Sequence, residues 1–205
     1  KYAVLSDTHL GDGGRADDFR DNEETLGTAL DYYRDGYSLI LLGDIEELWQ
    51  FDLQRIVDRY DPSIYQRLRA FGAGRVHRVF GNHDIEWGSA PDPAIPGREA
   101  RGAPEGLRLI DANGGIRIFL VHGHQGTADS DKHSWLSRFG VRAWTPVERV
   151  VRTAGLYDNP SDPKSRITKD YEKIRYEWAM KEKIIIVCGH SHRAIFESKS
   201  RAEEI

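Results

Sequence analysis

The feature that most constrains this chain is a recurring pattern of a short apolar run, a small turn, and then Asp, Asn or His. Three such runs lie in the first half of the sequence, at residues 2–5, 38–42 and 76–80. Two more follow, at residues 116–121 and 184–188. Apolar runs of this length are typical of buried strands, and helix-like segments separate the first three. An order of strand, helix and strand predicts a largely parallel sheet covered by helices, and therefore an α/β fold.

The segments between the first three strands are predicted to be helical over residues 22–35, 45–60 and 63–71. The first places apolar side chains at helical spacing. The third begins with Ser63 and Gln66, which form a capping-box pattern.

The second half of the chain predicts a hairpin and a helical insertion. Asn113-Gly114-Gly115 lies between two apolar runs, which is typical of a β-hairpin turn. We expect residues 132–183 to form a helical cap insertion, with one helix at about residues 168–183. The chain is then one domain over residues 1–205, with the cap inserted into it.

Composition places the chain among ordinary globular proteins. It has 205 residues, of which 39% are hydrophobic and 30% charged. Apolar runs stay far below the ~20 residues that a membrane-spanning helix needs. The single cysteine excludes an internal disulfide framework, so we expect a cytoplasmic protein.

Charge is distributed unevenly along the chain. The formal net charge is -4, which argues against a nucleic-acid partner. Residues 132–183 nevertheless carry 12 Lys and Arg against 7 Asp and Glu. The expected cap is therefore basic and the rest of the protein acidic. The oligomeric state is left open.

The polar residues after the strands suit a pair of divalent cations. The ends of parallel strands meet at one edge of a sheet, so these side chains are expected to converge. Carboxylate, amide and imidazole ligands accommodate Mn, Fe or Zn, and the lack of thiolates argues against a structural zinc site. Two such ions can polarise a phosphoryl oxygen and generate hydroxide near neutral pH. The residues concerned are Asp7, His9, Asp44, Asn82, His83, Asp84, His122, His124, His190 and His192.

The ordered motifs resemble those of the calcineurin-like metallophosphoesterase superfamily. They are Asp7-x-His9, Gly43-Asp44, Gly81-Asn82-His83-Asp84, His122-Gly123 and Gly189-His190-x-His192. The resemblance implies a four-layer αββα sandwich and a phosphohydrolase that uses two divalent ions, for which Mn is the preferred choice.

The same resemblance implies a role for each matched residue. Asp7, His9 and His192 would bind one metal, and Asn82, His122 and His190 the other. Asp44 would bridge the two ions. His83 would contact the phosphate and assist the leaving group, Asp84 would orient His83, and a metal-bridging hydroxide would attack phosphorus. His124 could either support a ligand or touch the phosphate.

The expected cap is similar to that of UDP-2,3-diacylglucosamine pyrophosphatases, which act on a lipid-bearing nucleotide diphosphate. Arg138 and Arg142 would then contact an anionic, lipid-linked substrate, and the basic cap could touch a membrane surface. The chain departs from that subfamily at His83, where those enzymes usually carry Arg. This departure favours a general phosphoesterase acting on a phosphorylated small molecule.

Two other function classes stay open at this point. A non-catalytic metallophosphoesterase-like scaffold would bind a partner protein, but such scaffolds usually lose ligand positions that this chain keeps. A nuclease of the same superfamily is disfavoured by the acidic charge of the protein, although the basic cap keeps it under consideration.

Overall fold

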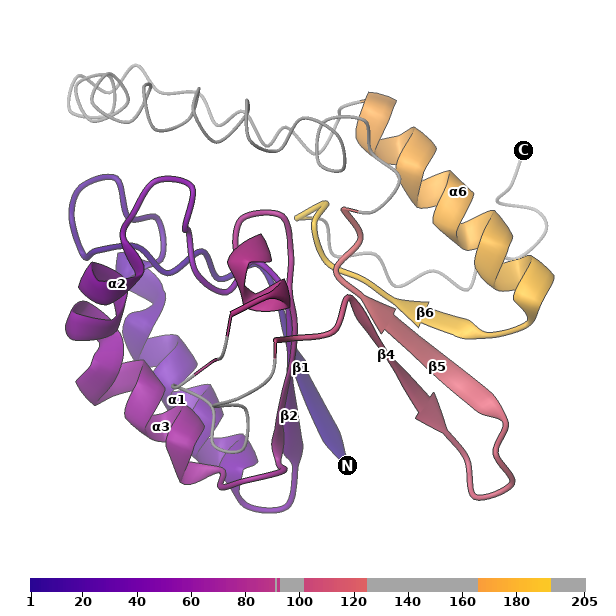
Figure 1. Cartoon of the computed structure of the whole chain (residues 1–205), viewed down its shortest axis with the longest axis horizontal. Coiled ribbons are helices and arrows are strands. Elements are labelled where there is room, and N and C mark those ends of the chain that lie inside the picture. Colours follow the sequence, from indigo (N-terminus) through magenta and orange to yellow (C-terminus); the bar gives the residue numbers. More distant parts are fainter. Residues whose placement is uncertain (91, 93–101, 125–165, 193–205) are drawn as a thin grey trace.

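Two three-stranded sheets form the centre of the protein, as Figure 1 shows for the computed structural model. The structure describes residues 1–90, 92, 102–124 and 166–192. Within them the chain is a mixed α/β protein, in agreement with the predicted fold class.

The first sheet is fully parallel, as predicted. It contains β1 (Tyr2–Leu5), β2 (Ser38–Leu42) and β3 (Val76–Val79), in that order across the sheet. Leu5 pairs with Leu41, and Leu42 pairs with Val79. Because the strands run in the same direction, the polar turns that follow them lie at the same edge.

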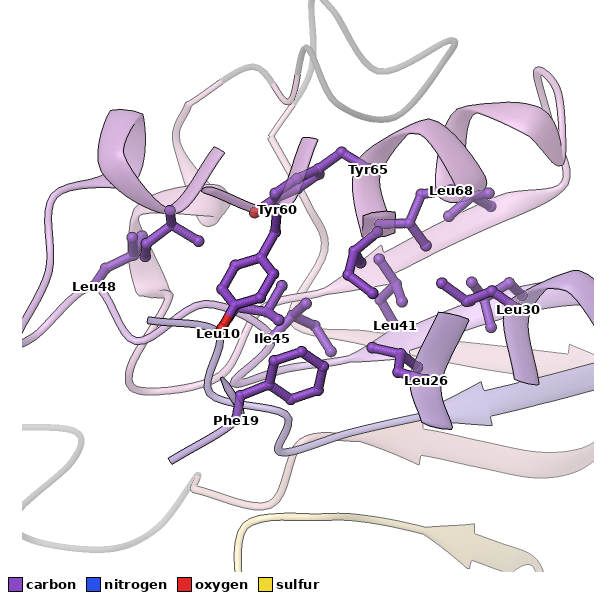
Figure 2. Close-up of a cluster of buried hydrophobic side chains, with 14 of the residues drawn as sticks. Leu10, Phe19, Leu26, Leu30, Leu41, Ile45, Leu48, Tyr60, Tyr65 and Leu68 are labelled. Atoms are coloured by element: carbon purple, nitrogen blue, oxygen red, sulfur yellow. The ribbon is translucent and has the colours of Figure 1, made fainter. Parts of the chain in front are cut away.

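Helices cover one face of this sheet (Figure 1). A short 3-10 turn (Arg20–Asn22) leads into α1 (Glu23–Arg34), and α2 (Leu53–Tyr60) and α3 (Gln66–Ala70) follow β2. Their apolar faces and one face of the sheet form the larger core cluster, drawn in part in Figure 2. Fully buried members include Leu10, Leu41, Ile56, Tyr60 and Tyr65.

The predicted helix over residues 45–60 is wrong in its first half. α2 begins only at Leu53, where the side chain of Asp52 accepts a hydrogen bond from the N–H of Gln54. Ile45, Leu48 and Trp49 have helical spacing, but they are buried in a loop that contains a turn at residues 48–50. A bridge between Leu10 and Glu46 continues the parallel pairing beyond β1 and β2, and only one turn follows, in which the N–H of Phe51 donates to the carbonyl oxygen of Glu47.

The predicted capping box at Ser63 is also wrong. The chain stays helical from α2 to α3 through a π-helical turn, η2 (Asp61–Tyr65). Pro62 in this turn has no N–H to donate, so the regular helical hydrogen bond is missing there and the turn widens.

The second sheet packs against the other face of the first. It contains β4 (Gly106–Ile110), β5 (Ile116–Val121) and β6 (Ile185–Val187). β4 and β5 form the predicted antiparallel hairpin, and β6 pairs with β5 in parallel. Residues from both sheets make a second core cluster, in which Ile40, Leu42, Val79 and Leu120 are buried.

The helix α6 (Arg166–Glu182) precedes β6 and lies beside the second sheet in Figure 1. Trp178 of this helix contacts Phe119 of β5, with ring centroids 5.6 Å apart. The helix confirms the one predicted at about residues 168–183. Residues 125–165 lie outside the described part, so the cap, its domain boundaries and the four-layer arrangement stay predictions. None of the helices among the described residues is long and apolar enough to cross a membrane.

Candidate metal centre

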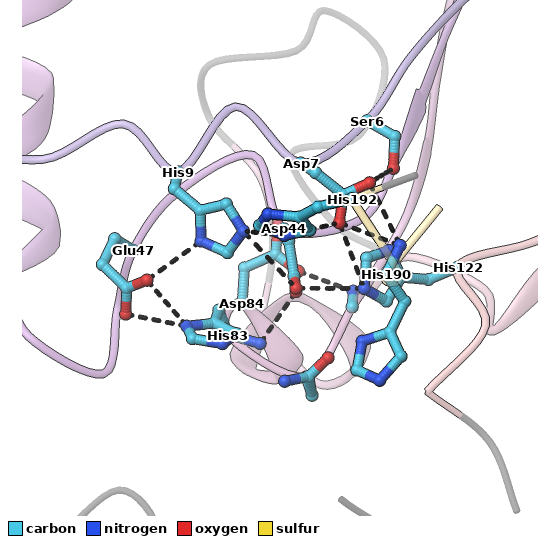
Figure 3. A network of polar contacts seen from close by, with 12 residues as sticks. Ser6, Asp7, His9, Asp44, Glu47, His83, Asp84, His122, His190 and His192 are labelled. Atoms are coloured by element: carbon cyan, nitrogen blue, oxygen red, sulfur yellow. Dashed lines mark hydrogen bonds and ion pairs between the residues drawn. The ribbon is translucent and has the colours of Figure 1, made fainter. Parts of the chain in front are cut away.

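Residues that follow strands of both sheets place their polar side chains in one cluster, as Figure 3 shows. Asp7 and His9 follow β1, Asp44 follows β2, and Asn82 and His83 follow β3. The second sheet adds His122 after β5 and the pair His190 and His192 after β6. The sequence motifs, which are far apart along the chain, therefore lie together in the structure.

The backbone is strained at these positions. Five of the six non-glycine residues with positive φ among the described residues are predicted metal ligands, with φ between 47° and 71°. They are Asp7, His9, Asp44, His190 and His192. Such conformations are rare for residues with a side chain, and they gather where a site requires them.

Asp7, His9 and His192 form one group that could hold a cation. Their ligand atoms all lie within 4.8 Å of one another. The Nε2 atoms of His9 and His192 are 3.2 Å apart, and Nε2 of His192 is 3.5 Å from Oδ1 of Asp7. Asp7 also accepts hydrogen bonds from Ser6 and from the backbone N–H of His190, which fix its carboxylate.

Asp44, His122 and His190 form another such group. Nδ1 of His122 donates to the carbonyl oxygen of Leu42 at 2.8 Å, which leaves Nε2 facing the site. Burial and the neighbouring His122 together lower the pKa of His190 to about 4, so this imidazole is neutral near neutral pH. A neutral imidazole is the form that binds metals.

Asp44 lies between the two groups. Its Oδ2 is 3.0 Å from Nε2 of His122 and 3.9 Å from Nε2 of His9. Burial opposes its ionisation, but the neighbouring imidazoles, His122 first, hold the pKa of Asp44 well below its usual value. With His9 and His83 it also makes a further group of ligand atoms, which the sequence did not predict.

Sequence reasoning missed Glu47, whose carboxylate holds two histidines. It lies 2.9 Å from Nδ1 of His9 and 2.7 Å from Nδ1 of His83. Burial opposes its charge, yet His83 and His9 lower the pKa of Glu47 to about 2. A carboxylate behind an imidazole fixes the ring orientation and directs the other nitrogen into the site. The signal was an acidic residue three positions after Asp44, inside the segment that was predicted to be helical.

Trp49 is a second residue that the sequence did not single out for this site. Its indole ring stacks on His83, with centroids 4.1 Å apart and planes 19° from parallel. Its Nε1–H donates to the carbonyl oxygen of Asn82 at 2.7 Å. Trp49 therefore contacts both residues of the Asn82-His83 pair.

The carboxylate of Asp84 contacts backbone N–H groups, and its role in orienting His83 stays a prediction. Its carboxylate accepts hydrogen bonds from the backbone N–H groups of Gly81 and Ile45, while Glu47 makes the contact with the ring of His83. Burial, and then the charges of Asp44 and Glu46, raise the pKa of Asp84 to about 6. Asp84 thus joins two loops, and the contact with Nδ1 of His83 comes from Glu47.

The donor set fits divalent cations. Oδ1 of Asn82 is buried and has no hydrogen-bond partner among the described residues, so an acceptor is left for a cation. Glu47 and the Leu42 carbonyl occupy Nδ1 of His9 and of His122, so the Nε2 atoms of both face Asp44. Imidazole nitrogens and carboxylate oxygens at these distances repel one another unless a proton or a cation lies between them.

The three remaining predicted site residues are His124, Arg138 and Arg142. His124 is buried next to His122 and His190, with ring centroids 5.6 and 6.5 Å away. That position is compatible with either role proposed for it. Arg138 and Arg142 lie outside the described residues, so their contact with a substrate stays a prediction.

Comparison with known proteins agrees with this geometry. The family model described as calcineurin-like phosphoesterase matches residues 1–194, which include every motif quoted above. The chain belongs to the calcineurin-like phosphoesterase family. No curated protein matches the chain. Membership in the calcineurin-like phosphoesterases supports metal-dependent phosphoester hydrolysis, and the two sheets of the structure are consistent with their fold.

Proposed function

We propose that this calcineurin-like phosphoesterase is a dinuclear metal-dependent phosphohydrolase. The observation that carries the proposal is the position of Asp44, whose carboxylate lies within 4 Å of a histidine from each of the two ligand groups. Asp7, His9 and His192 would hold one cation, and Asn82, His122 and His190 the other, with Asp44 shared. Mn is the preferred metal, with Fe and Zn as alternatives for the same donors.

The cations, when bound, supply Lewis-acid polarisation of a phosphoryl oxygen and an acidified water. The chain itself supplies the groups that position and protonate the substrate. Glu47 holds Nδ1 of His83, and Trp49 covers one face of the same ring, so Nε2 is the free end. His83 would direct this nitrogen at the leaving oxygen and donate a proton to it, in the manner of a general acid.

The substrate class that we propose is a phosphoester of a small molecule. A diphosphate of the UDP-diacylglucosamine type would depend on Arg138 and Arg142 of the expected cap, and His83 stands where those pyrophosphatases usually carry Arg. Lipid binding and membrane contact depend on the same cap. The scaffold alternative is disfavoured because every ligand position and His83 are kept.

Metal content and hydrolysis measured together test the proposal. We expect about two equivalents of Mn²⁺ per chain after loading, and Mn²⁺-dependent hydrolysis in a panel of p-nitrophenyl phosphate, bis-p-nitrophenyl phosphate, UDP-diacylglucosamine and cyclic nucleotides. His77→Ala is the matched control, because His77 lies in β3 outside the ligand groups. A protein that binds no metal and hydrolyses none of these compounds would contradict the proposal.

A further inference from the structure

A fully buried arginine lies beneath the candidate metal centre. Arg78 belongs to β3, and its side chain has no exposed surface. Nη1 and Nη2 contact the two oxygens of Glu46 at 2.6 and 3.0 Å, and Nε is 2.7 Å from Asp92. Its Cζ also lies over the ring of Trp87, 4.9 Å from the centroid. Such a planar fork is specific in its geometry as well as charged.

Glu46 is the partner that connects Arg78 to the loop after β2. It stands two residues after Asp44 and is fully buried. Besides the fork of Arg78, it accepts hydrogen bonds from the hydroxyl of Tyr65 and from Nε1 of Trp87. The position of residues 43–47 is therefore tied to β3 and to two helical turns by a single side chain.

Asp84 connects the same arginine to the loop after β3. Its Oδ2 lies 3.7 Å from Nη1 of Arg78, and this carboxylate bonds the N–H groups of Ile45 and Gly81. The two loops approach closely, because a Cβ atom at Gly81 would lie 2.1 Å from Oδ1 of Asp44. A small change in the distance between the two loops would move Asp44 relative to Asn82.

A contribution to stability is by itself a weak explanation for this buried network of Arg78, Glu46 and Asp84. Buried ion pairs lose so much hydration that apolar replacements of similar volume are often neutral or stabilising. Buried ionic groups are better known for fixing the register between two segments of a protein. Here the two segments are the loops that carry Asp44 and Asn82.

We propose that Arg78 is a positioning residue, which through Glu46 and Asp84 fixes the separation of residues 43–47 and 81–84 and so places Asp44 opposite Asn82. The inference rests on the proposed function. A purely structural role would lower the stability of the protein and leave the metal site of the folded fraction unchanged.

Two conservative variants test the inference, with Co²⁺ as a spectroscopic probe. Arg78→Lys keeps the charge and loses the planar fork. Glu46→Gln keeps the size of the side chain and one acceptor oxygen, so it serves if Arg78→Lys does not fold. Tyr60→Phe is the matched control, because it removes a different buried contact with a carboxylate, the 2.5 Å hydrogen bond to Asp17.

We expect the folded variants to show an altered visible Co²⁺ spectrum and a Co²⁺ dissociation constant raised by ~10- to 100-fold, as for other residues that support ligands. The kcat for bis-p-nitrophenyl phosphate should fall while KM changes little. Variants that only lose thermal stability, as Tyr60→Phe should, and keep the wild-type spectrum and affinity would overturn the inference alone. Wild-type protein without bound Co²⁺ would overturn the proposed function, and this inference with it.

Discussion

Oδ2 of Asp44 lies 3.0 Å from Nε2 of His122, and both side chains are buried. Burial favours the neutral imidazole, but the carboxylate of Asp44 more than reverses this and raises the pKa of His122 to about 9. Near neutral pH the His122 imidazole of the metal-free protein therefore keeps its proton, and a cation that binds through Nε2 would displace it.

Metal affinity should consequently increase with pH. Between pH 7 and about pH 9 the proton on His122 becomes easier to displace, so apparent Co²⁺ affinity should rise and then level off. Calorimetric titration in two buffers of different ionisation enthalpy measures the released proton directly. Constant affinity over this range, with no proton release, would contradict the assignment of His122.

The stability of the metal-free protein should fall as pH rises, whereas metal affinity should increase. The folded-state pKa of His122 is raised above its ordinary value of 6.5, so its ion pair stabilises the fold fully below that pH. The contribution is lost as pH rises through about 9. Thermal unfolding of chelator-treated protein from pH 6 to 9.5 would show this as a falling midpoint.

Asp44→Asn should abolish turnover and weaken both metals, because it removes the negative charge shared by the two groups. The amide oxygen can still accept from the N–H of His83, a bond of 2.8 Å in the wild type, so the fold should persist. Metal stoichiometry and circular dichroism on the same sample separate the two effects. Near-normal rates with two bound metals would refute the shared position of Asp44.

His83→Ala should keep the metals and lose rate, by roughly 10²–10⁴-fold for a general acid. The loss should be larger for phenyl phosphate than for p-nitrophenyl phosphate, because phenol is the poorer leaving group and needs the proton more. Equal losses for the two substrates would point to phosphate binding instead. Loss of metal would make His83 a ligand, as its group with His9 and Asp44 allows.

Glu47→Gln should weaken metal binding by ~10- to 100-fold and also lower the rate, because one carboxylate serves His9 and His83 together. The glutamine side chain has one acceptor oxygen where the glutamate carboxylate has two, and it carries no negative charge. Glu23→Gln is the control, since Glu23 pairs with Arg59 in contacts outside the ligand groups. A Glu47→Gln protein with wild-type affinity and rate would show that neither histidine needs this support.

His192→Gly and His192→Ala should differ in stability although both remove the same predicted ligand. The backbone of His192 has a φ of 50°, which glycine adopts without the penalty that a Cβ atom brings. We expect the metal-free glycine variant to be more stable than the alanine variant by ~1 kcal/mol. Equal unfolding midpoints would mean that the strain at this position is negligible.

The sequence predicted the strands of the first sheet and the residues at their ends, because both depend on local patterns. Apolar runs such as Leu39–Leu42 are long enough only for strands, and the Asp and His residues directly after them stand out. The hairpin at Asn113 and the helix α6 were predictable for the same reason.

Residues 45–51 could not be predicted, because distant contacts determine their conformation. Ile45, Leu48 and Trp49 repeat at helical spacing, yet the bridge between Glu46 and Leu10 holds the start of the segment extended, and only a single turn follows at residues 48–50. Glu46 is charged and fully buried, which makes sense only with Arg78 beside it, 32 residues away. Local propensity contains no information about such a partner, and for the same reason the contact of Glu47 with His83 stayed hidden.

The site combines residues from opposite ends of the described chain, since His9 and His192 are 183 positions apart. During synthesis the first sheet can form on the ribosome long before β6 has emerged. A nascent chain with only the first sheet would carry four of the seven predicted ligands and would bind metal weakly. Full metal capture, and the activity that depends on it, should begin only after β6 and His192 have emerged from the exit tunnel.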